Sequence, residues 1–178
     1  MMRFCSNCGA KLDYRIPEGD DRPRFVCDSC QVVHYQNPKI VVGCIPEWED
    51  KILLCKRAIE PRLGKWTLPA GYLENSETLA EGAHRETLEE ADADVEILSP
   101  YAMFDLPFIS QIYLLFRARL RDSRFGPTAE SSKVRLITEE DIPWDDLAFN
   151  VIKETLVRYF DDRSEGTFRF QTGNLART

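Results

Sequence analysis

Three glutamates in the middle of the chain have the spacing of a metal-binding cluster. Glu86, Glu89 and Glu90 stand at positions i, i+3 and i+4, which share one face when the segment is helical. Carboxylates packed this closely repel one another, and each then tends to keep its proton. A divalent cation removes that cost, and hard oxygen ligands suit Mg²⁺ or Mn²⁺ rather than zinc. The alternative is a solvated run of charges on an outer helix face, which we adopt for Glu81 only.

A second metal-binding pattern lies at the N-terminus of the chain. The six cysteines are Cys5, Cys8, Cys27, Cys30, Cys44 and Cys55. The first four form two C-x2-C knuckles, a spacing that can place four thiolates tetrahedrally around one zinc ion. A pair of redox dithiols or disulfides is the alternative. A segment of roughly 30 residues cannot build much of a core, so we expect zinc to hold it together.

The remaining ligand-type side chains have simpler interpretations. His34 could replace a cysteine as a zinc ligand, but we interpret it as a loop residue beside the knuckles. Cys44 and Cys55 lie within apolar runs and are expected to be buried thiols.

The glutamate cluster lies within the clearest helix of the sequence, expected over residues 78–91. Thr78 and Glu81 fit a capping box at its start, and Asp92 tolerates the left-handed geometry of a helix exit better than most residues. Gly82 costs a helix about 1 kcal/mol relative to alanine, which indicates close packing there. The stripe expected to be buried consists of Leu79, Ala80, Ala83, Thr87, Leu88 and Ala91.

Apolar and β-branched runs on both sides of this helix predict strands. Residues 39–45 and 51–56 predict a hairpin. Further strands are expected over residues 95–98, 102–106, 110–120 and 134–138. A second helix is expected within residues 144–160, where apolar residues recur at spacings of three and four: Phe149, Ile152, Leu156 and Phe160. The pattern predicts a mixed α/β domain with central strands and two main helices.

Composition limits the classes of function. With 178 residues, the chain fits one domain and a small appendage. The formal net charge of −7 argues against binding DNA, RNA or an anionic membrane mainly through a basic surface. No run approaches the ~18 apolar residues of a membrane span, and we recognise no signal peptide. Because zinc thiolates persist in a reducing compartment, we predict a cytoplasmic protein.

The glutamates belong to a longer string, Gly71-x5-Glu77-x7-Arg85-Glu86-Thr87-Leu88-Glu89-Glu90-Ala91-Asp92-Ala93. This string resembles the Nudix box, G-x5-E-x7-R-E-U-x-E-E-x-G-U, in which U is a bulky aliphatic residue. Thr87 departs from an aliphatic position and Asp92 from the last glycine, and Ala93 is small at the other aliphatic position. None of the three is a metal ligand, so we expect altered packing or helix exit rather than lost chemistry.

The resemblance implies a fold and a division of the chain. A Nudix α/β/α sandwich with a mixed sheet is expected over residues 35–163. A zinc ribbon precedes it over residues 1–34, and a polar tail over residues 164–178 follows it, ordered in part by Phe168 and Phe170.

The resemblance also implies roles for the matched residues. The set that it implies for the catalytic Mg²⁺ (or Mn²⁺) is Glu77, Glu86, Glu89 and Glu90, with Glu77 acting through water. Arg85 is implied to orient Glu86 by a charge-assisted hydrogen bond. The general base stays open between Glu86 and Glu130, because family members often bring a glutamate from a loop between late strands. A solvated loop charge is the alternative for Glu130.

Nearly the whole chain resembles the plant-type FAD and ADP-ribose pyrophosphatases of the Nudix family. The resemblance lies in the ribbon and in YQNPKIVVGC, LLCKR, GKWTLPAGYLE and DLPFISQIYLLF. It implies hydrolysis of FAD to FMN and AMP, and of ADP-ribose to ribose 5-phosphate and AMP. NADH pyrophosphatases also join a zinc ribbon to a Nudix domain, but their S-Q-P-W-P-F-P-x-S stretch is absent, and residues 105–111 occupy that region. An NADH pyrophosphatase or NAD-capped RNA decapping enzyme is therefore the alternative.

Side chains around the box are candidates for substrate contacts. Arg57 and Arg62 could hold phosphate. The aromatic candidates for a flat ring are Trp66, Tyr72, Phe104, Phe108 and Tyr113. Core packing is the alternative for each aromatic residue, and an exposed surface position is the alternative for each arginine.

A different class of function is a nucleotide-sensing regulator whose ribbon contacts nucleic acid or protein. The mixed charge of the ribbon is a weak nucleic-acid footprint. We therefore expect a small dinucleotide or nucleotide-sugar substrate, with neither nucleic acid nor membrane as partner. We also expect a homodimer, the commonest assembly of soluble proteins.

Overall fold

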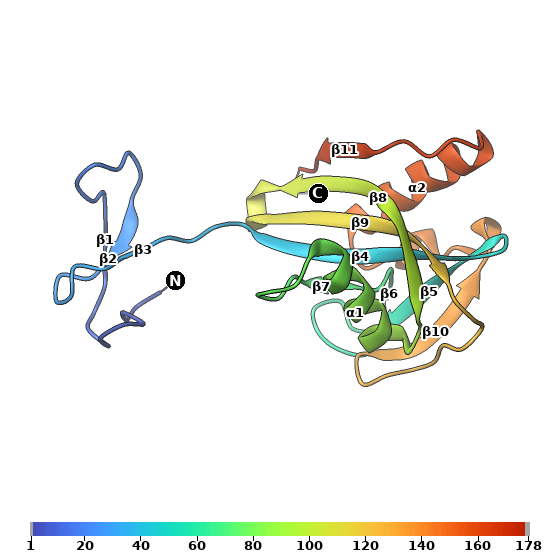
Figure 1. Ribbon diagram of the computed structural model, residues 1–178, viewed down its shortest axis with the longest axis horizontal. Helices are drawn as coiled ribbons and strands as arrows, with labels where there is room; N and C mark the ends of the chain where they lie inside the picture. Colours follow the sequence, from blue (N-terminus) through green and yellow to red (C-terminus); the bar gives the residue numbers. More distant parts are fainter. Residues whose placement is uncertain (1, 177–178) are drawn as a thin grey trace. The chain divides into compact units, whose positions relative to one another are not determined.

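The computed structural model describes residues 2–176. The chain forms two compact units, and the boundary between them lies between Asn37 and Pro38 (Figure 1). In the part of the chain that the structure describes, none of the helices is both long enough and apolar enough to span a membrane.

The N-terminal unit is a small antiparallel sheet. It contains β1 (Asp13–Arg15), β2 (Arg24–Val26) and β3 (Val33–His34), in the order β1-β2-β3. Its buried apolar residues are few: Phe25 and Val26 lie beside Cys5 and Cys27. A core this small stabilises little, so the fold of this unit depends on the cysteine knuckles.

The second unit is built on an eight-stranded mixed sheet. The strand order is β10-β5-β4-β9-β8-β11, with β6 paired to β5 and β7 paired to β4. The strands are β4 (Lys39–Trp48), β5 (Lys51–Arg57), β6 (Trp66–Thr67), β7 (Ala70–Tyr72), β8 (Val95–Leu106), β9 (Gln111–Leu120), β10 (Ser131–Ile137) and β11 (Gln171–Asn174). The helices are α1 (Leu79–Ala91) and α2 (Asn150–Ser164), and the 3-10 turns are η1 (Pro107–Ile109), η2 (Glu139–Asp141) and η3 (Trp144–Asp146).

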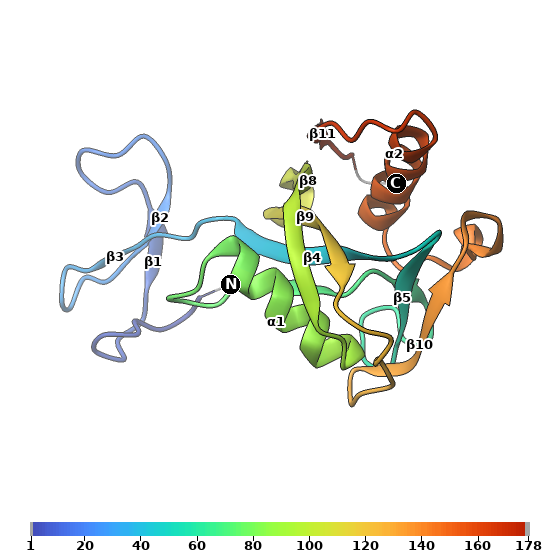
Figure 2. The ribbon, with the colours of Figure 1, turned by 45° about the vertical axis from the view of Figure 1, so that its right-hand side comes forward.

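Alternation along the strands divides the core into two layers. Along β4, Val41 and Ile45 join the cluster that contains α2, whereas Val42 and Cys44 join the cluster that contains α1. Successive side chains of a strand point to opposite faces of its sheet. The two helices therefore cover opposite faces (Figure 2), and the predicted α/β/α sandwich with a mixed sheet is confirmed.

The strands on both sides of α1 follow the predicted pattern with one difference. β4 and β5 form the expected hairpin, with Trp48 opposite Lys51. β8 is one continuous strand where the sequence predicted two, over residues 95–98 and 102–106. Its pairing with β9 shifts register on both sides of Pro100, and these irregularities accommodate a proline within the strand.

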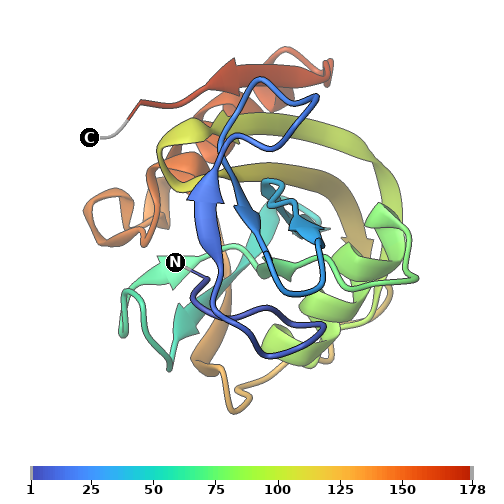
Figure 3. The same ribbon diagram turned by 90° about the vertical axis from the view of Figure 1, so that its left-hand side faces the viewer.

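The C-terminal segment forms the edge of the sheet. Where the sequence predicted a polar tail over residues 164–178, β11 pairs in parallel with residues 102–105 of β8 (Figure 3). Phe168 packs against the core as expected, whereas Phe170 is 53% exposed. Only Phe168 of the two aromatic residues therefore anchors this segment. The strand itself was not predicted, because four residues without an apolar run give no periodic signal.

Candidate active site

The four cysteines of the knuckles converge on one point. Their Sγ atoms all lie within 4.8 Å of one another, with 3.6 Å between Cys5 and Cys30 and 3.5 Å between Cys8 and Cys27. Four Zn–S bonds of about 2.3 Å in a tetrahedron place sulfurs roughly 3.8 Å apart, so this set fits zinc. All are free thiols, and sulfurs this far apart are not disulfides.

The surroundings of the knuckles favour the thiolate at Cys30 but not at Cys27, whose pKa is raised to about 11 by burial and by a hydrogen bond with Cys8. A hydrogen bond from the backbone of Val32, and then one from Asn7, lower the pKa of Cys30 to about 6. His34 Nε2 lies 3.3 Å from Cys5 Sγ, so His34 contacts a ligand rather than replacing one.

The two remaining cysteines are buried thiols, as expected. Cys44 and Cys55 are fully buried, and burial raises the pKa of Cys44 to about 12 and that of Cys55 further.

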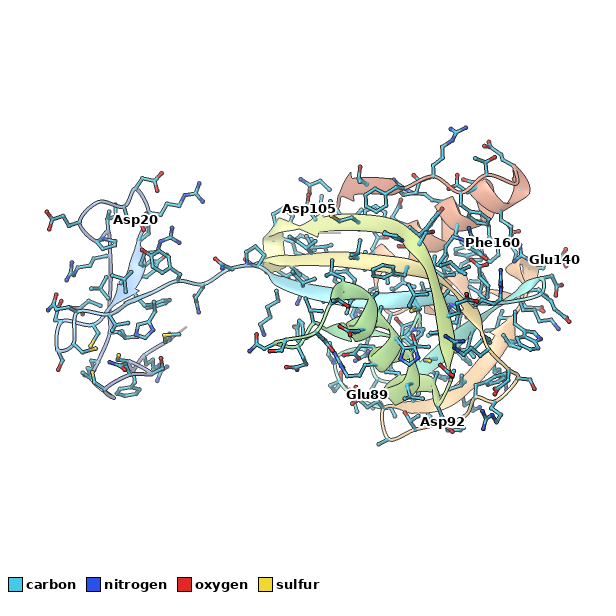
Figure 4. The ribbon with its side chains drawn as sticks, viewed as in Figure 1. Asp20, Glu89, Asp92, Asp105, Glu140 and Phe160 are labelled. Carbon is cyan, nitrogen blue, oxygen red and sulfur yellow. The ribbon has the colours of Figure 1, made fainter. Side chains whose placement is uncertain are left out.

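Helix α1 begins and ends as the sequence predicts. Thr78 Oγ1 accepts a hydrogen bond from the backbone of Glu81 at 3.2 Å, and the Glu81 carboxylate accepts one from the backbone of Thr78 at 2.8 Å. Asp92 adopts the left-handed conformation with φ 49°, and its N–H donates to Leu88 O at 2.9 Å. Figure 4 labels Glu89 and Asp92 near this end of the helix.

The buried stripe of α1 differs from the predicted one. Leu79 and Leu88 are 38% and 46% exposed, whereas Glu86 and Glu90 are 8% and 5% exposed. The inward face of the helix therefore carries carboxylates where an apolar pattern predicted leucines. Two charged groups turned towards a sheet indicate a site rather than a packing surface.

Arg85 holds the carboxylates of the box together. Its Nε and Nη2 donate to Glu77 at 3.0 and 2.7 Å, and its Nη1 contacts Glu86 at 2.7 Å and Glu89 at 3.0 Å. Nη2 also donates to the backbone oxygen of Tyr72 at 3.1 Å. The hydrogen bonds from Arg85 lower the pKa of Glu77 to about 2.

Glu90 is the most deeply buried of these carboxylates. Its Oε2 accepts a hydrogen bond from the backbone of Ala70 at 3.0 Å. Its pKa is raised to about 8, mainly by burial and also by the charges of Glu86 and Glu130, while the Ala70 hydrogen bond and the charge of Arg57 act against the rise. Burial also raises the pKa of Glu86. Neighbouring buried carboxylates are the oxygen donors that a hard divalent cation neutralises, so this set fits Mg²⁺ or Mn²⁺.

The carboxylates nevertheless do not meet at one point. Within residues 2–176, the four cysteines are the one group of three or more metal-type ligands whose donor atoms all lie within 4.8 Å. Glu77, Glu86 and Glu89 contact the guanidinium of Arg85 instead, so metal binding requires these side chains to rearrange.

Two glycines allow the close packing of this site. A Cβ at Gly71 would overlap the carboxylate of Glu86, and one at Gly82 would lie 2.7 Å from Glu77 Oε1 and 3.0 Å from Leu73 Cδ1. The close packing predicted at Gly82 is confirmed.

The departures at Thr87 and Asp92 leave the helix intact. Thr87 is fully buried, and its hydroxyl donates to Ala83 O at 2.8 Å. A threonine at an aliphatic position of the box therefore buries no unpaired hydroxyl.

Arg57 is the better placed of the two candidate phosphate ligands. It is 9% exposed, its Nε donates to Pro61 O at 2.8 Å, and its guanidinium carbon lies 5.4 Å from the centroid of the Phe149 ring. Its influence on the pKa of Glu90 places it near the carboxylates. Arg62 lies on the exposed loop after β5, with φ 66°.

The aromatic candidates divide into core and surface residues. Phe104 is fully buried beneath Gly173 and Arg158, which favours core packing, the alternative to a substrate contact, for this residue. Trp66 and Tyr113 are 8% and 9% exposed and belong to the same core cluster. Tyr72 and Phe108 are exposed.

Sequence reasoning missed two polar residues that fix Tyr72. Lys39 Nζ lies 4.5 Å from the centroid of the Tyr72 ring, and Gln111 Nε2 donates to its hydroxyl at 3.0 Å. Lys39 and Gln111 are paired across the parallel strands β4 and β9. A parallel register between distant segments leaves no mark on the sequence, so no local signal could have identified this pair.

Glu130 lies on the loop immediately before β10. Its backbone oxygen accepts a hydrogen bond from Ala58 N at 2.7 Å. Its negative charge raises the pKa of both Glu86 and Glu90, so the three carboxylates lie near one another.

The structure is an α/β/α sandwich in which one helix presents to the sheet a group of glutamates, two of them bonded to Arg85. The chain belongs to the Nudix family. The family model described as NUDIX domain matches residues 37–160, and the model described as Nudix N-terminal, a zinc ribbon, matches residues 3–36.

A solved relative extends the similarity over the whole chain. The crystal structure of a NUDIX hydrolase from Nitrosomonas europaea is 58% identical, with a TM-score of 0.96, and the match covers 99% of this chain and 100% of that one. An ADP-ribose pyrophosphatase structure from Streptococcus suis, at 22% identity and a TM-score of 0.60, covers 78% of this chain and all of that one. The second similarity concerns the fold alone.

Curated relatives carry more specific names. The NAD-capped RNA hydrolase NudC of Photobacterium profundum is 30% identical over 129 residues, which are 71% of this chain and 46% of that protein. An ADP-ribose pyrophosphatase of Methanocaldococcus jannaschii is 36% identical over 73 residues, which are 41% of this chain and 43% of that protein. The chain spans about half the length of the curated relatives that it matches.

Proposed function

We propose that the protein is a metal-dependent pyrophosphatase that hydrolyses the diphosphate of nucleoside diphosphate derivatives, with FAD and ADP-ribose as its substrates. One observation carries the proposal: Glu86 and Glu90 are buried beside each other on the inward face of α1, and Arg85 bonds Glu86. Burial of two carboxylates on one helix face disfavours folding unless their charge is compensated. A bound divalent cation compensates this charge, and the same cation can bind phosphate oxygens.

The residues of the box divide the work of binding. Glu86, Glu89 and Glu90 would hold the divalent cation, with Arg85 orienting Glu86 and Glu89 and the backbone of Ala70 orienting Glu90. When bound, Mg²⁺ (or Mn²⁺) polarises the phosphate oxygens and lowers the pKa of the attacking water. Glu77 keeps Arg85 in place, and its carboxylate also accepts a hydrogen bond from Glu74 N at 2.6 Å.

We assign the role of general base to Glu130 rather than to Glu86. Glu86 is buried and bonded to Arg85, and it is one of the proposed metal ligands. The Glu130 carboxylate makes no hydrogen bond or ion pair within the described residues, and it lies near Glu86 and Glu90. A carboxylate free of partners can accept the proton of the attacking water.

Phosphate and ring contacts come from the sheet side of the site. Arg57 donates one hydrogen bond from Nε to Pro61 O, which leaves its two terminal nitrogens for a phosphate group. Tyr72 directly follows the box glycine and is 45% exposed, so its ring can pack against the flat part of a dinucleotide.

NADH or NAD-capped RNA is the second candidate substrate. The names of curated relatives favour this candidate, since several of them are NAD-capped RNA hydrolases. The ribbon itself gives little support to an RNA contact. Arg15 pairs with Asp28 at 2.6 Å and Arg24 with Asp20 at 2.9 Å, so these cations are already neutralised.

Product analysis tests the proposal. FAD, ADP-ribose, NADH and NAD-capped RNA are incubated with the protein and Mg²⁺, with EDTA as the matched control, and the products are separated by chromatography. We expect metal-dependent AMP together with FMN or ribose 5-phosphate. Fastest cleavage of NADH or capped RNA would select the second candidate. No hydrolysis of any substrate by folded, zinc-loaded protein contradicts the proposal and favours the sensing regulator.

A substitution that spares the fold links the activity to the box. Glu89 is the half-exposed member of the set, with 54% of its side chain exposed, so Glu89→Gln removes a ligand charge at little cost to stability. We expect turnover to fall by orders of magnitude, and near-normal turnover contradicts the metal assignment.

A further inference from the structure

We infer that Thr128 is a positioning residue for the proposed general base, because its hydroxyl ties the loop that carries Glu130 to the end of the metal-binding helix. The inference rests on the proposed function and concerns the geometry of the same site.

The hydroxyl of Thr128 makes three hydrogen bonds. Oγ1 donates to the backbone oxygen of Glu90 at 3.3 Å, and it accepts from the backbone N–H groups of Glu130 and Ser131, each at 3.2 Å. A hydroxyl has one donor and two acceptor lone pairs, so all its bonding capacity is used. The backbone N–H of Thr128 donates to Ser131 O at 3.0 Å, which closes a turn around Glu130.

The carbonyl that Thr128 reaches belongs to the last turn of α1. The final carbonyls of a helix have no partner within the helix and must be satisfied from outside. The next carbonyl, that of Ala91, accepts from the backbone of Gly126 at 2.8 Å. The loop between β9 and β10 therefore docks on the C-terminal end of α1. Figures 1 and 2 show this loop below the helix.

This docking links two groups of the proposed site. Glu90 contributes its backbone oxygen to Thr128 and its carboxylate to the metal-binding set. Glu130 contributes its backbone N–H to Thr128 and its carboxylate as the base. The hydroxyl thus fixes the backbone of the base relative to the backbone of a metal ligand. On its other side, Glu130 O is held by Ala58 N at the end of β5.

Loss of the hydroxyl removes the link between the backbone N–H of Glu130 and the carbonyl of Glu90, while the Gly126–Ala91 and Ala58–Glu130 hydrogen bonds keep the loop on the helix. Valine keeps the shape of threonine but removes the donor and both acceptors, whereas serine keeps them. A misplacement of about 1 Å in a reacting group costs a reaction about 100-fold. The effect should appear in kcat rather than in KM, because the substrate contacts proposed above come from other residues.

A double-mutant cycle tests the inference. Wild type, Thr128→Val, Thr128→Ser, Glu130→Gln and the double variant are compared for kcat and KM on ADP-ribose with Mg²⁺. Thr128→Ala is made in both backgrounds, so that poor folding of the valine variant leaves a second measurement. Thr138→Val is the matched control, because Thr138 Oγ1 also makes a loop hydrogen bond, to Asp141 at 2.9 Å. Thermal unfolding is measured for every variant.

We expect Thr128→Val to lower kcat by about 10- to 100-fold and Thr128→Ser to restore it to within about threefold. In the Glu130→Gln background, Thr128→Val should cause no further loss, because residues that act as a unit are not additive. Wild-type turnover in Thr128→Val, or equal losses in both backgrounds, overturns the inference and leaves the proposed function standing. A wild-type protein that hydrolyses no substrate of the panel overturns both.

Discussion

Arg85 and Glu77 are joined by a two-point ion pair, in which Nε and Nη2 of the guanidinium lie 3.0 and 2.7 Å from the two carboxylate oxygens. The pair joins the loop before α1, which carries Glu77, to the second turn of α1, which carries Arg85. It therefore fixes the helix relative to the loop between Gly71 and α1. The remaining Nη1 bonds Glu86 and Glu89. Arg85 is therefore the centre of the site, and its planar fork matters as much as its charge.

Arg85→Lys tests this relationship. Lysine keeps the positive charge but cannot bond Glu77 at two points while also contacting Glu86. We expect kcat to fall by about 10- to 100-fold, with the far-ultraviolet circular dichroism unchanged. Arg163→Lys is the matched control, because Arg163 also makes a two-point contact, to the backbone oxygens of Asp50 and Glu49. Equal turnover in the two lysine variants contradicts a special role for the guanidinium of Arg85.

The pKa of Glu90 predicts proton release on metal binding. Burial raises this pKa to about 8, so the carboxyl group is largely protonated at pH 7 before metal binds. Because a metal ligand must be deprotonated, binding of Mg²⁺ releases this proton, and the apparent affinity rises between pH 6 and about 8. Titration calorimetry in buffers of different ionisation enthalpy measures the proton count. A count near zero at pH 7 contradicts the prediction.

The same shift predicts how the metal-free protein responds to pH. Between the ordinary pKa of 4.5 and the raised value of about 8, the folded protein binds more protons at Glu90 than the unfolded chain. The contribution of Glu90 to stability is therefore greatest below its ordinary pKa and is lost as pH rises through the raised one. In Glu90→Gln, stability should fall less steeply with pH than in wild type. The unfolding temperature of both proteins, measured from pH 5 to 9 in EDTA, tests this. An identical decline in the variant assigns it to other groups.

Much of the fold was predictable because its signals are local. The capping residues Thr78 and Glu81 and the exit residue Asp92 act within a few positions along the chain, and apolar and β-branched runs predicted β4, β5 and β9. β11 was not predictable, because four residues held by one neighbouring strand carry no pattern of their own. Pro100 misled the prediction for β8, since a proline that usually ends a strand is accommodated there by two register shifts.

The candidate site was predictable to the extent that it lies on one helix. The spacing of Glu86, Glu89 and Glu90 predicted that these carboxylates lie close together on α1. The apolar pattern predicted that Leu79 and Leu88 are buried, and both are exposed. Contacts between segments that are distant in the sequence could not be predicted from local patterns. Phe104 was a candidate for a substrate contact with core packing as the alternative, and only the fold shows that Gly173 covers its ring.

Removal of zinc should unfold the ribbon and spare the second unit. Few apolar residues are buried in residues 2–37, so the fold of this part depends on its knuckles. We expect hydrogen exchange after chelation to show loss of protection in β1–β3 and unchanged protection in α1 and α2. Protection that persists in the ribbon contradicts a structural role for zinc.

His34 should tune the zinc affinity of the knuckles. Its Nε2 lies 3.3 Å from Cys5 Sγ, the distance of a hydrogen bond to a ligand. Partners of metal ligands typically change affinity about 10- to 100-fold when removed. His34→Ala should therefore weaken zinc binding, measured by competition with a chromogenic chelator, and His34→Gln, which keeps an N–H donor, should weaken it less. Equal affinities in wild type and His34→Ala rule out this contribution.

Asp92 offers a test of stability that leaves the chemistry alone. It adopts φ 49° at the exit of α1, a conformation that glycine reaches without the steric cost paid by other residues. Asp92→Gly should raise the free energy of unfolding by about 0.5–1 kcal/mol, which corresponds to a rise of roughly 1–4 °C in Tm. Asp92→Ala is the matched opposite, because alanine has the steric cost of positive φ and lacks the side-chain oxygens of aspartate. The Tm of this variant should fall.

Both variants should keep wild-type kcat, since no hydrogen bond or ion pair within the described residues joins the Asp92 carboxylate to the glutamate set. A lower Tm for Asp92→Gly than for wild type would show that the aspartate stabilises the helix exit through its side chain rather than merely tolerating the geometry.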